Sequence, residues 1–149
     1  MSEDRIERDT LIEAPLERVW SLVATPGFWV ADEESVAGTV ATEGASLMAK
    51  NPNLGEVAVR VEKVEPPTYV AYRWASAFPG EGLREDNSTL VEFTLTSTED
   101  GKTRLRVVES GFATLGTTEE ARGNAVRFNT EGWPQVFDVV KKRVEQSSV

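Results

Sequence analysis

The chain has 149 residues, 40% of them hydrophobic, and this suffices for one domain over residues 1–149 because a domain of this size buries roughly 70% of its unfolded surface. Histidine and cysteine are both absent, which excludes Ser-His-Asp and Cys-His catalytic groups, disulfides and the common zinc ligand sets. The net charge of −9 disfavours nucleic acid and anionic membranes as partners, and without cysteine, a basic leader or ~20 consecutive apolar residues the expected location is the cytoplasm.

The first elements predicted are a strand and two short helices. Residues 5–13 alternate imperfectly and predict a strand, which ends at Ala14-Pro15 because proline cannot donate to a ladder. Apolar side chains at helical spacing over residues 16–23 predict a helix directly after it. Thr25-Pro26-Gly27 ends this helix, and Phe28-Trp29-Val30 predicts a second, very short one.

The middle of the chain is predicted to be β-structure. Asp32-Glu33-Glu34 is interpreted as a solvated loop, since adjacent carboxylates point in different directions, and no metal and no cofactor are expected. Two weaker strands flank a turn at Glu43-Gly44, and an Asp-Gly turn joins the last two strands at Asp100-Gly101. The predicted strands are 35–40, 45–50, 56–64, 68–75, 89–96 and 103–110.

A long C-terminal helix is the element around which the sheet is expected to curve. Its apolar stripe is predicted to face the sheet and consists of Trp133, Val136, Phe137, Val140 and Val144. Thr117 is the expected N-cap of the preceding helical segment, with Glu120 completing a capping box. Pro134 predicts either a kink or a fresh helix start.

Several stretches of the chain resemble the START-like (SRPBCC) superfamily. They are residues 12–20 (IEAPLERVW), 64–67 (VEPP) leading to 72–74 (YRW), 108–112 (VESGF) and 131–133 (EGW). The branch they resemble is the one related to the activator of the heat-shock protein 90 ATPase. The extra residues 121–130 and Pro134 depart from the plainer members of this superfamily.

The resemblance implies an α+β helix-grip fold, with a curved antiparallel sheet of six to seven strands around the last helix and two short helices after the first strand. It also implies a deep cavity between sheet and helix, which the superfamily uses for lipids, hormones, polyketides and aromatic compounds. It does not imply one activity, because the superfamily contains carriers, cyclases, hydrolases and chaperone partners.

Inward-facing aromatic residues are the candidate ligand-binding set, because pockets are mostly apolar with a few polar groups. The alternative interpretation is ordinary core packing, to which Trp20 is assigned outright. Together with Glu109, the candidates are Trp29, Tyr72, Trp74, Phe93, Phe112, Trp133 and Phe137.

Glu109 is the candidate ionisable group, because it follows Leu105 and Val107 at the two-residue period of a strand. Its carboxyl is expected to point inward, either paired with a cation such as Arg127 or kept partly neutral by desolvation. The alternative is that the strand frays at Gly111 and the carboxyl reaches solvent. Asn129 is considered with Arg127 as a residue at the cavity mouth or on a solvated helix face. The strand arginines expected to be exposed are Arg60, Arg73 and Arg106.

Three functions are compatible with the sequence. The first is a binding protein for a hydrophobic small molecule, aromatic or acyl, held between sheet and helix. The second is an enzyme that needs no cofactor and uses Glu109, with Tyr72 or a water, for proton transfer. The third is an interaction module that meets a chaperone, or a second copy of the chain, through its outer surface.

Overall fold

One antiparallel sheet forms the body of the protein, with its strands in the order β1-β6-β5-β4-β3-β2. This computed structural model describes residues 5–25, 28–29, 42–51, 55–75, 87–112, 115–116 and 118–145. Within these residues the strands are β1 (Arg5–Ile12), β2 (Ser46–Asn51), β3 (Gly55–Glu65), β4 (Tyr69–Trp74), β5 (Thr89–Ser97) and β6 (Thr103–Ser110). The strand predicted over residues 35–40 lies outside the described residues.

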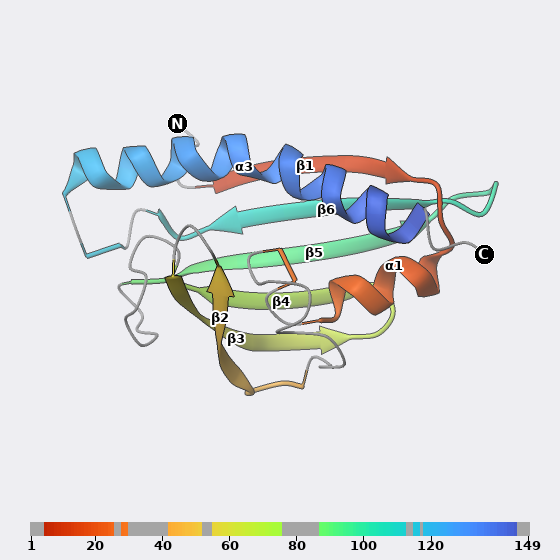
Figure 1. The fold of residues 1–149 in the computed structure, drawn as a ribbon, viewed down its shortest axis with the longest axis horizontal. Helices are drawn as coiled ribbons and strands as arrows, with labels where there is room; N and C mark the ends of the chain where they lie inside the picture. Colours follow the sequence, from red (N-terminus) through yellow and green to blue (C-terminus); the bar gives the residue numbers. More distant parts are fainter. Residues whose placement is uncertain are drawn as a thin grey trace.

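Successive strands from β2 to β6 lie side by side, and β1 joins the sheet beside β6 (Figure 1). The β5–β6 connection is the predicted Asp100-Gly101 turn, in which the Thr98 N–H donates to the Lys102 carbonyl at 2.9 Å. Gly101 has a φ of 81°, a conformation that costs glycine little and disfavours side chains with a Cβ. Turn chemistry therefore fixes the register of the two strands that carry the candidate site.

Helix α1 (Leu16–Val23) follows β1 as predicted, with Val19 and Val23 buried. Trp20 is partly buried and packs against the core. Ala24 is the C-cap of this helix, and its N–H donates to the Trp20 carbonyl at 2.8 Å. Phe28 and Trp29 form a turn, while the remainder of the predicted second helix lies outside the described residues.

Helix α3 (Glu119–Glu145) is the long C-terminal helix, and its start differs from the prediction. The Thr118 hydroxyl accepts the Ala121 N–H at 3.1 Å, so Thr118 is the N-cap. The predicted capping box, with Thr117 as the cap and Glu120 as the third residue, is wrong by one position. Both threonines offer the same hydroxyl, so the sequence could not distinguish between them.

Pro134 lies inside α3, which continues through it, so the predicted fresh start at this proline is wrong. Residues 121–130 are simply the first turns of the same helix. In Figure 1 the axis of α3 changes direction partway along its length. Pro134 is on the exposed side of the helix, where water can solvate the carbonyl that lacks its usual N–H donor.

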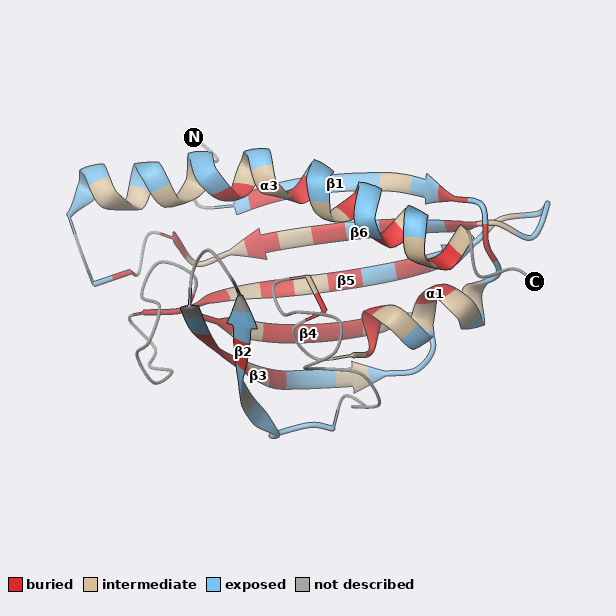
Figure 2. Ribbon diagram, viewed as in Figure 1, coloured by how far each residue is buried: buried red, intermediate tan, exposed pale blue. Residues whose placement is uncertain are grey.

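Both helices cover the same face of the sheet, and the core lies between them and the strands (Figure 2). The predicted stripe of α3 faces this core, with Trp133, Phe137, Val140 and Val144 buried and Val136 partly buried. These features confirm the α+β helix-grip fold class. Among the described residues, neither helix combines the length and apolar character needed to cross a membrane.

The opposite face of the sheet carries polar side chains that pair across strands. Arg106 bonds to Glu7, and Arg104 lies 3.9 Å from Asp9. The partly exposed Arg60 and Arg73 both contact Glu62, at 2.5 Å and 4.0 Å. Arg60, Arg73 and Arg106 lie on the outer face as predicted, and exposed pairs of this kind contribute little to stability.

Candidate functional site

The register of the strands brings three residues together on the inner face of the sheet: the predicted Trp74 and Glu109, and Thr89, which was not predicted. Trp74 on β4 lies opposite Thr89 on β5, and Val91, two residues further along β5, lies opposite Glu109 on β6. Residues two apart on a strand share a face. Trp74, Thr89 and Glu109 therefore come from three neighbouring strands and point toward the same space beneath α3.

Helix α3 supplies the remaining two members of this group. Asn129 and Trp133 are four residues apart, so they lie on the same face of the helix. Both are buried, with 4% and 2% of their surfaces exposed. The helix thereby closes the site from the side opposite the sheet.

The carboxyl of Glu109 is completely buried and accepts hydrogen bonds from four side chains. Oε1 accepts from Trp133 Nε1 at 2.9 Å and from Asn129 Nδ2 at 3.2 Å. Oε2 accepts from Trp74 Nε1 at 2.8 Å, Thr89 Oγ1 at 2.6 Å and Asn129 Nδ2 at 3.0 Å. Two indoles, one hydroxyl and one amide thus hold the carboxyl; we call these five residues the Glu109 network.

The described side chains that bond to this carboxyl are all neutral donors. Arg127, the cation named in one of the two alternatives for Glu109, is exposed and donates to Asn124 Oδ1 at 3.3 Å, so the alternative of pairing with Arg127 is wrong. The helical spacing explains the difference, because Asn129, not Arg127, falls on the buried face of α3. Burial raises the pKa of Glu109 above its usual range, while hydrogen bonds from Thr89, Trp74, Trp133 and Asn129 oppose this shift.

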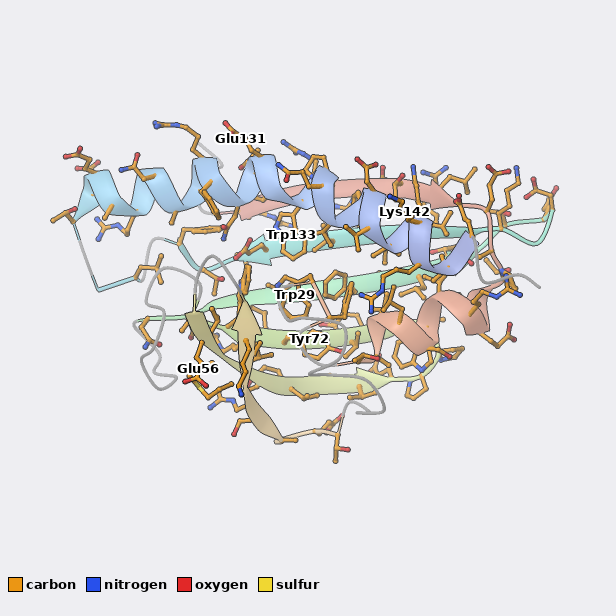
Figure 3. The ribbon with its side chains drawn as sticks, viewed as in Figure 1. Trp29, Glu56, Tyr72, Glu131, Trp133 and Lys142 are labelled. Atoms are coloured by element: carbon orange, nitrogen blue, oxygen red, sulfur yellow. The ribbon has the colours of Figure 1, made fainter. Side chains whose placement is uncertain are left out.

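An aromatic cluster adjoins the Glu109 network, with Trp29 at its centre. The Trp29 ring centroid lies 5.0 Å from that of Tyr72, 5.4 Å from Trp74 and 5.5 Å from Phe93. It lies 6.2 Å from the ring of Trp133 on α3. Figure 3 shows Trp29 between Trp133 above and Tyr72 below, so its indole bridges helix and sheet.

Trp29 also carries an unusual polar atom. Its Nε1 is buried, yet it has no hydrogen-bond partner within the described part of the chain. The other two indole nitrogens of the cluster, those of Trp74 and Trp133, both donate to Glu109. Buried donors without an acceptor are rare and cost about 1–3 kcal/mol each.

Ring contacts and hydrogen bonds join six of the eight predicted site residues, and the other two are buried in the same hydrophobic core. Phe112 and Phe137 are buried but take no part in the ring contacts recorded among the described residues. The six that meet are Trp29, Tyr72, Trp74, Phe93, Glu109 and Trp133.

Sequence reasoning missed Thr89 and Phe28 and left the position of Asn129 open. Thr89 precedes the inward-facing Val91 at the period of a strand, and Asn129 precedes Trp133 by four residues. Extending the two periods by one step would have predicted both as inward. Phe28, whose ring lies 5.3 Å from Phe93, had no periodic signal because it lies in a turn.

Tyr72, proposed from sequence as a proton-transfer partner of Glu109, is engaged elsewhere. Its hydroxyl donates to the Val23 carbonyl at 2.6 Å and thus ties the end of α1 to the sheet. Burial raises the pKa of Tyr72 far above its ordinary value. Tyr72 is therefore a neutral structural donor, not an acid or base beside Glu109.

Replacing Thr89 by Val is expected to raise the pKa of Glu109 further, because the substitution removes a donor to the ionised carboxyl and preserves shape. Carbon-detected NMR titration of the Glu109 carboxyl measures this shift. Thr103→Val is the matched control, since the buried Thr103 hydroxyl donates to the Ala14 carbonyl instead. A downward shift in the Thr89 variant, or an equal shift in both, would contradict the assigned hydrogen bond.

The raised pKa of Glu109 also predicts a pH-dependent stability difference between the wild type and Glu109→Gln. The folded state holds the proton more tightly than the unfolded state. Relative to the variant, the wild type should be most stable below about pH 4.3 and lose stability as pH rises through the folded pKa. The slope cannot exceed about 1.4 kcal/mol per pH unit. Urea unfolding across a pH series tests this, and a difference that grows in favour of the wild type would indicate a lowered pKa.

The described residues contain no group of three Asp or Glu side chains close enough to hold a metal ion. The Asp32-Glu33-Glu34 run lies outside them. The chemistry available to the Glu109 network is thus that of one buried carboxyl, neutral donors and aromatic rings.

Comparison with known sequences identifies one family. The profile described as Activator of Hsp90 ATPase homolog 1-like protein matches residues 13–145. No curated protein matches the chain at a significant level.

Solved structures with the same fold share little sequence with this chain. Protein MLL2253 from Mesorhizobium loti superimposes with a TM-score of 0.73 at 21% identity, over 97% of this chain and 99% of that one. The Aha1 dimer from Colwellia psychrerythraea gives 0.67 at 18% identity, over 97% and 98%. DynU16, a protein in the dynemicin biosynthetic locus, gives 0.70 at 23% identity, over 95% of this chain and 47% of that one.

Proposed function

Because the chain belongs to the Activator of Hsp90 ATPase homolog 1-like family, we propose that it binds a hydrophobic small molecule, aromatic or acyl, between the sheet and α3. The observation that carries this proposal is the aromatic cluster around Trp29, to which a turn, two strands and the helix each contribute rings. Apolar pockets with a few fixed polar groups are typical ligand sites. The absence of cysteine is consistent with the cytoplasm as the compartment.

Native mass spectrometry of protein purified without denaturation tests this proposal. A non-covalent ligand retained at one copy per chain supports it, and the mass defines the ligand class. Trp29→Ala should reduce retention, whereas Trp20→Ala, outside the recorded ring contacts, is the control. Protein that carries no ligand and binds neither a fatty acid nor a polycyclic aromatic compound in thermal-shift assays would contradict the proposal.

A second function, proton transfer on the bound ligand by Glu109, is supported by the burial of its carboxyl and the upward direction of its pKa shift, because a carboxyl that holds its proton more tightly can act as a general acid. The reaction would need no cofactor. Incubating the retained ligand with the wild type and with Glu109→Gln tests this. Chemical change that depends on Glu109 supports an enzyme, while an unchanged ligand in both favours a carrier.

The family description and the Aha1 dimer also suggest protein partners, namely a chaperone or a second copy of this chain. Light scattering after gel filtration measures the oligomeric state. Co-migration with purified Hsp90 tests the chaperone, and a monomer that fails to bind would reject both partners.

A further inference from the structure

We infer that Trp29 Nε1 is the hydrogen-bond donor that selects the ligand, and that the ligand is a neutral, planar aromatic compound with a carbonyl oxygen on its ring system. This inference rests on the proposed function and narrows its ligand class. It excludes simple acyl chains and aromatic carboxylates.

Trp29 differs from the two tryptophans it contacts in the hydrogen bonding of its indole nitrogen. Trp74 Nε1 and Trp133 Nε1 are buried and each donates to Glu109, at 2.8 and 2.9 Å. Trp29 Nε1 is buried in the same cluster, without an acceptor in the described part of the chain. The described residues thus supply acceptors for two of the three indoles, and the third donor is open to an outside group.

Glu109 cannot serve as that acceptor, because its capacity is already used. Its two oxygens take five donor contacts from Trp74, Thr89, Asn129 and Trp133. An ionised carboxylate offers about four lone-pair sites. With Glu109 already engaged, no acceptor for Trp29 Nε1 is found among the described residues, and we assign that role to a bound molecule.

The side chains around Trp29 indicate the shape and the charge of the ligand. Its ring is flanked by Tyr72, Trp74 and Phe93 from the sheet and by Trp133 from the helix. Aromatic rings pack on other rings in offset or edge-on geometries, which favours a planar aromatic ligand over a flexible chain. The rings around Trp29 carry no charge, so an anionic ligand would lose its hydration among them without an opposite charge beside it, and a neutral carbonyl avoids most of that cost.

Fluorenone and fluorene provide a matched probe pair, because they share one planar tricyclic skeleton and differ in the carbonyl. Equilibrium dialysis should show the wild type binding fluorenone at least tenfold more tightly than fluorene, since a site with a dedicated donor rejects an analogue that lacks the acceptor. Trp29→Phe keeps a ring but removes the N–H, so the ratio should fall to about one. Trp20→Phe should preserve the wild-type ratio.

Indole N–H NMR of the wild type gives a second readout that does not depend on any variant folding. Fluorenone should shift the Trp29 Nε1–H resonance and slow its exchange with solvent, while fluorene should do neither. Equal binding of both compounds, or an unchanged ratio in Trp29→Phe, would overturn the inference and leave the proposed function standing. Binding of neither compound would also overturn the inference, while the proposed function would be decided by the ligand retained in native mass spectrometry and by fatty-acid binding.

Discussion

Replacing Glu109 by leucine is expected to lower the free energy of unfolding at pH 7 by at least about 3 kcal/mol, as read from urea unfolding midpoints. Glu109 is the acceptor for Trp74 Nε1, Trp133 Nε1 and Asn129 Nδ2. Each buried donor left without an acceptor costs about 1–3 kcal/mol. The substitution also removes the cost of burying the carboxyl itself, and this offsets part of the total.

Glu109→Gln is the graded control for this prediction. Its amide keeps one acceptor oxygen, so its NH₂ must face either Trp74 Nε1 or Trp133 Nε1, and one indole loses its partner at a cost of about 1–3 kcal/mol. The carboxyl of the wild type avoids this conflict because each of its two oxygens accepts from one indole. The expected order of stability is wild type, Gln variant, Leu variant. A leucine variant as stable as the wild type would mean that the indoles find other acceptors.

A second large effect is expected from Phe137→Ala, which should cost about 3–5 kcal/mol of folding free energy. Phe137 is only 6% exposed and packs where α3 meets the sheet. Deleting its ring removes transfer free energy and leaves a cavity that the surrounding strands cannot fill. Thermal or urea unfolding measures the loss.

Phe128→Ala is the matched control, because the same substitution is made on the same helix at a side chain that is 65% exposed. Its effect should stay within about 0.5 kcal/mol. Alanine has a higher helix propensity than phenylalanine, so neither loss can arise from propensity. Similar losses in both variants, or a loss below about 1 kcal/mol at Phe137, would contradict the burial of Phe137 against the sheet.

Periodicity explains why much of the fold was predictable. The alternation of Val91, Phe93 and Leu95 determined the inner face of β5, and the spacing of Trp133 and Phe137 determined the buried face of α3. These patterns are local, so one sequence suffices to detect them. The predicted start of α3 was wrong because Thr117 and Thr118 carry the same capping hydroxyl, and the observed cap is Thr118.

The partners of Glu109 were harder to predict because they arise from the meeting of separate elements. Alternation from Leu105 predicted that its side chain points inward, which burial confirms. Which donors it meets depends on the pairing of β5 with β6 and on where α3 crosses the sheet. The sequence offered Arg127 as a nearby opposite charge, but the helix turns that side chain outward and Asn129 inward. Ligand binding by these residues stays a prediction.

The position of β1 affects the order in which the protein can assemble during synthesis. Among the described strands, β1 is made first and pairs with β6, which is made last, at positions such as Arg5 and Ser110. The emerging N-terminal strand therefore has no partner until residues 103–110 have left the ribosome, and contacts so distant in sequence form slowly. β6 also carries Glu109, and α3 follows with Asn129 and Trp133. Closing the sheet and burying the acid are consequently late events of folding, and a nascent chain that stalls before β6 exposes the open edges of both β1 and β5.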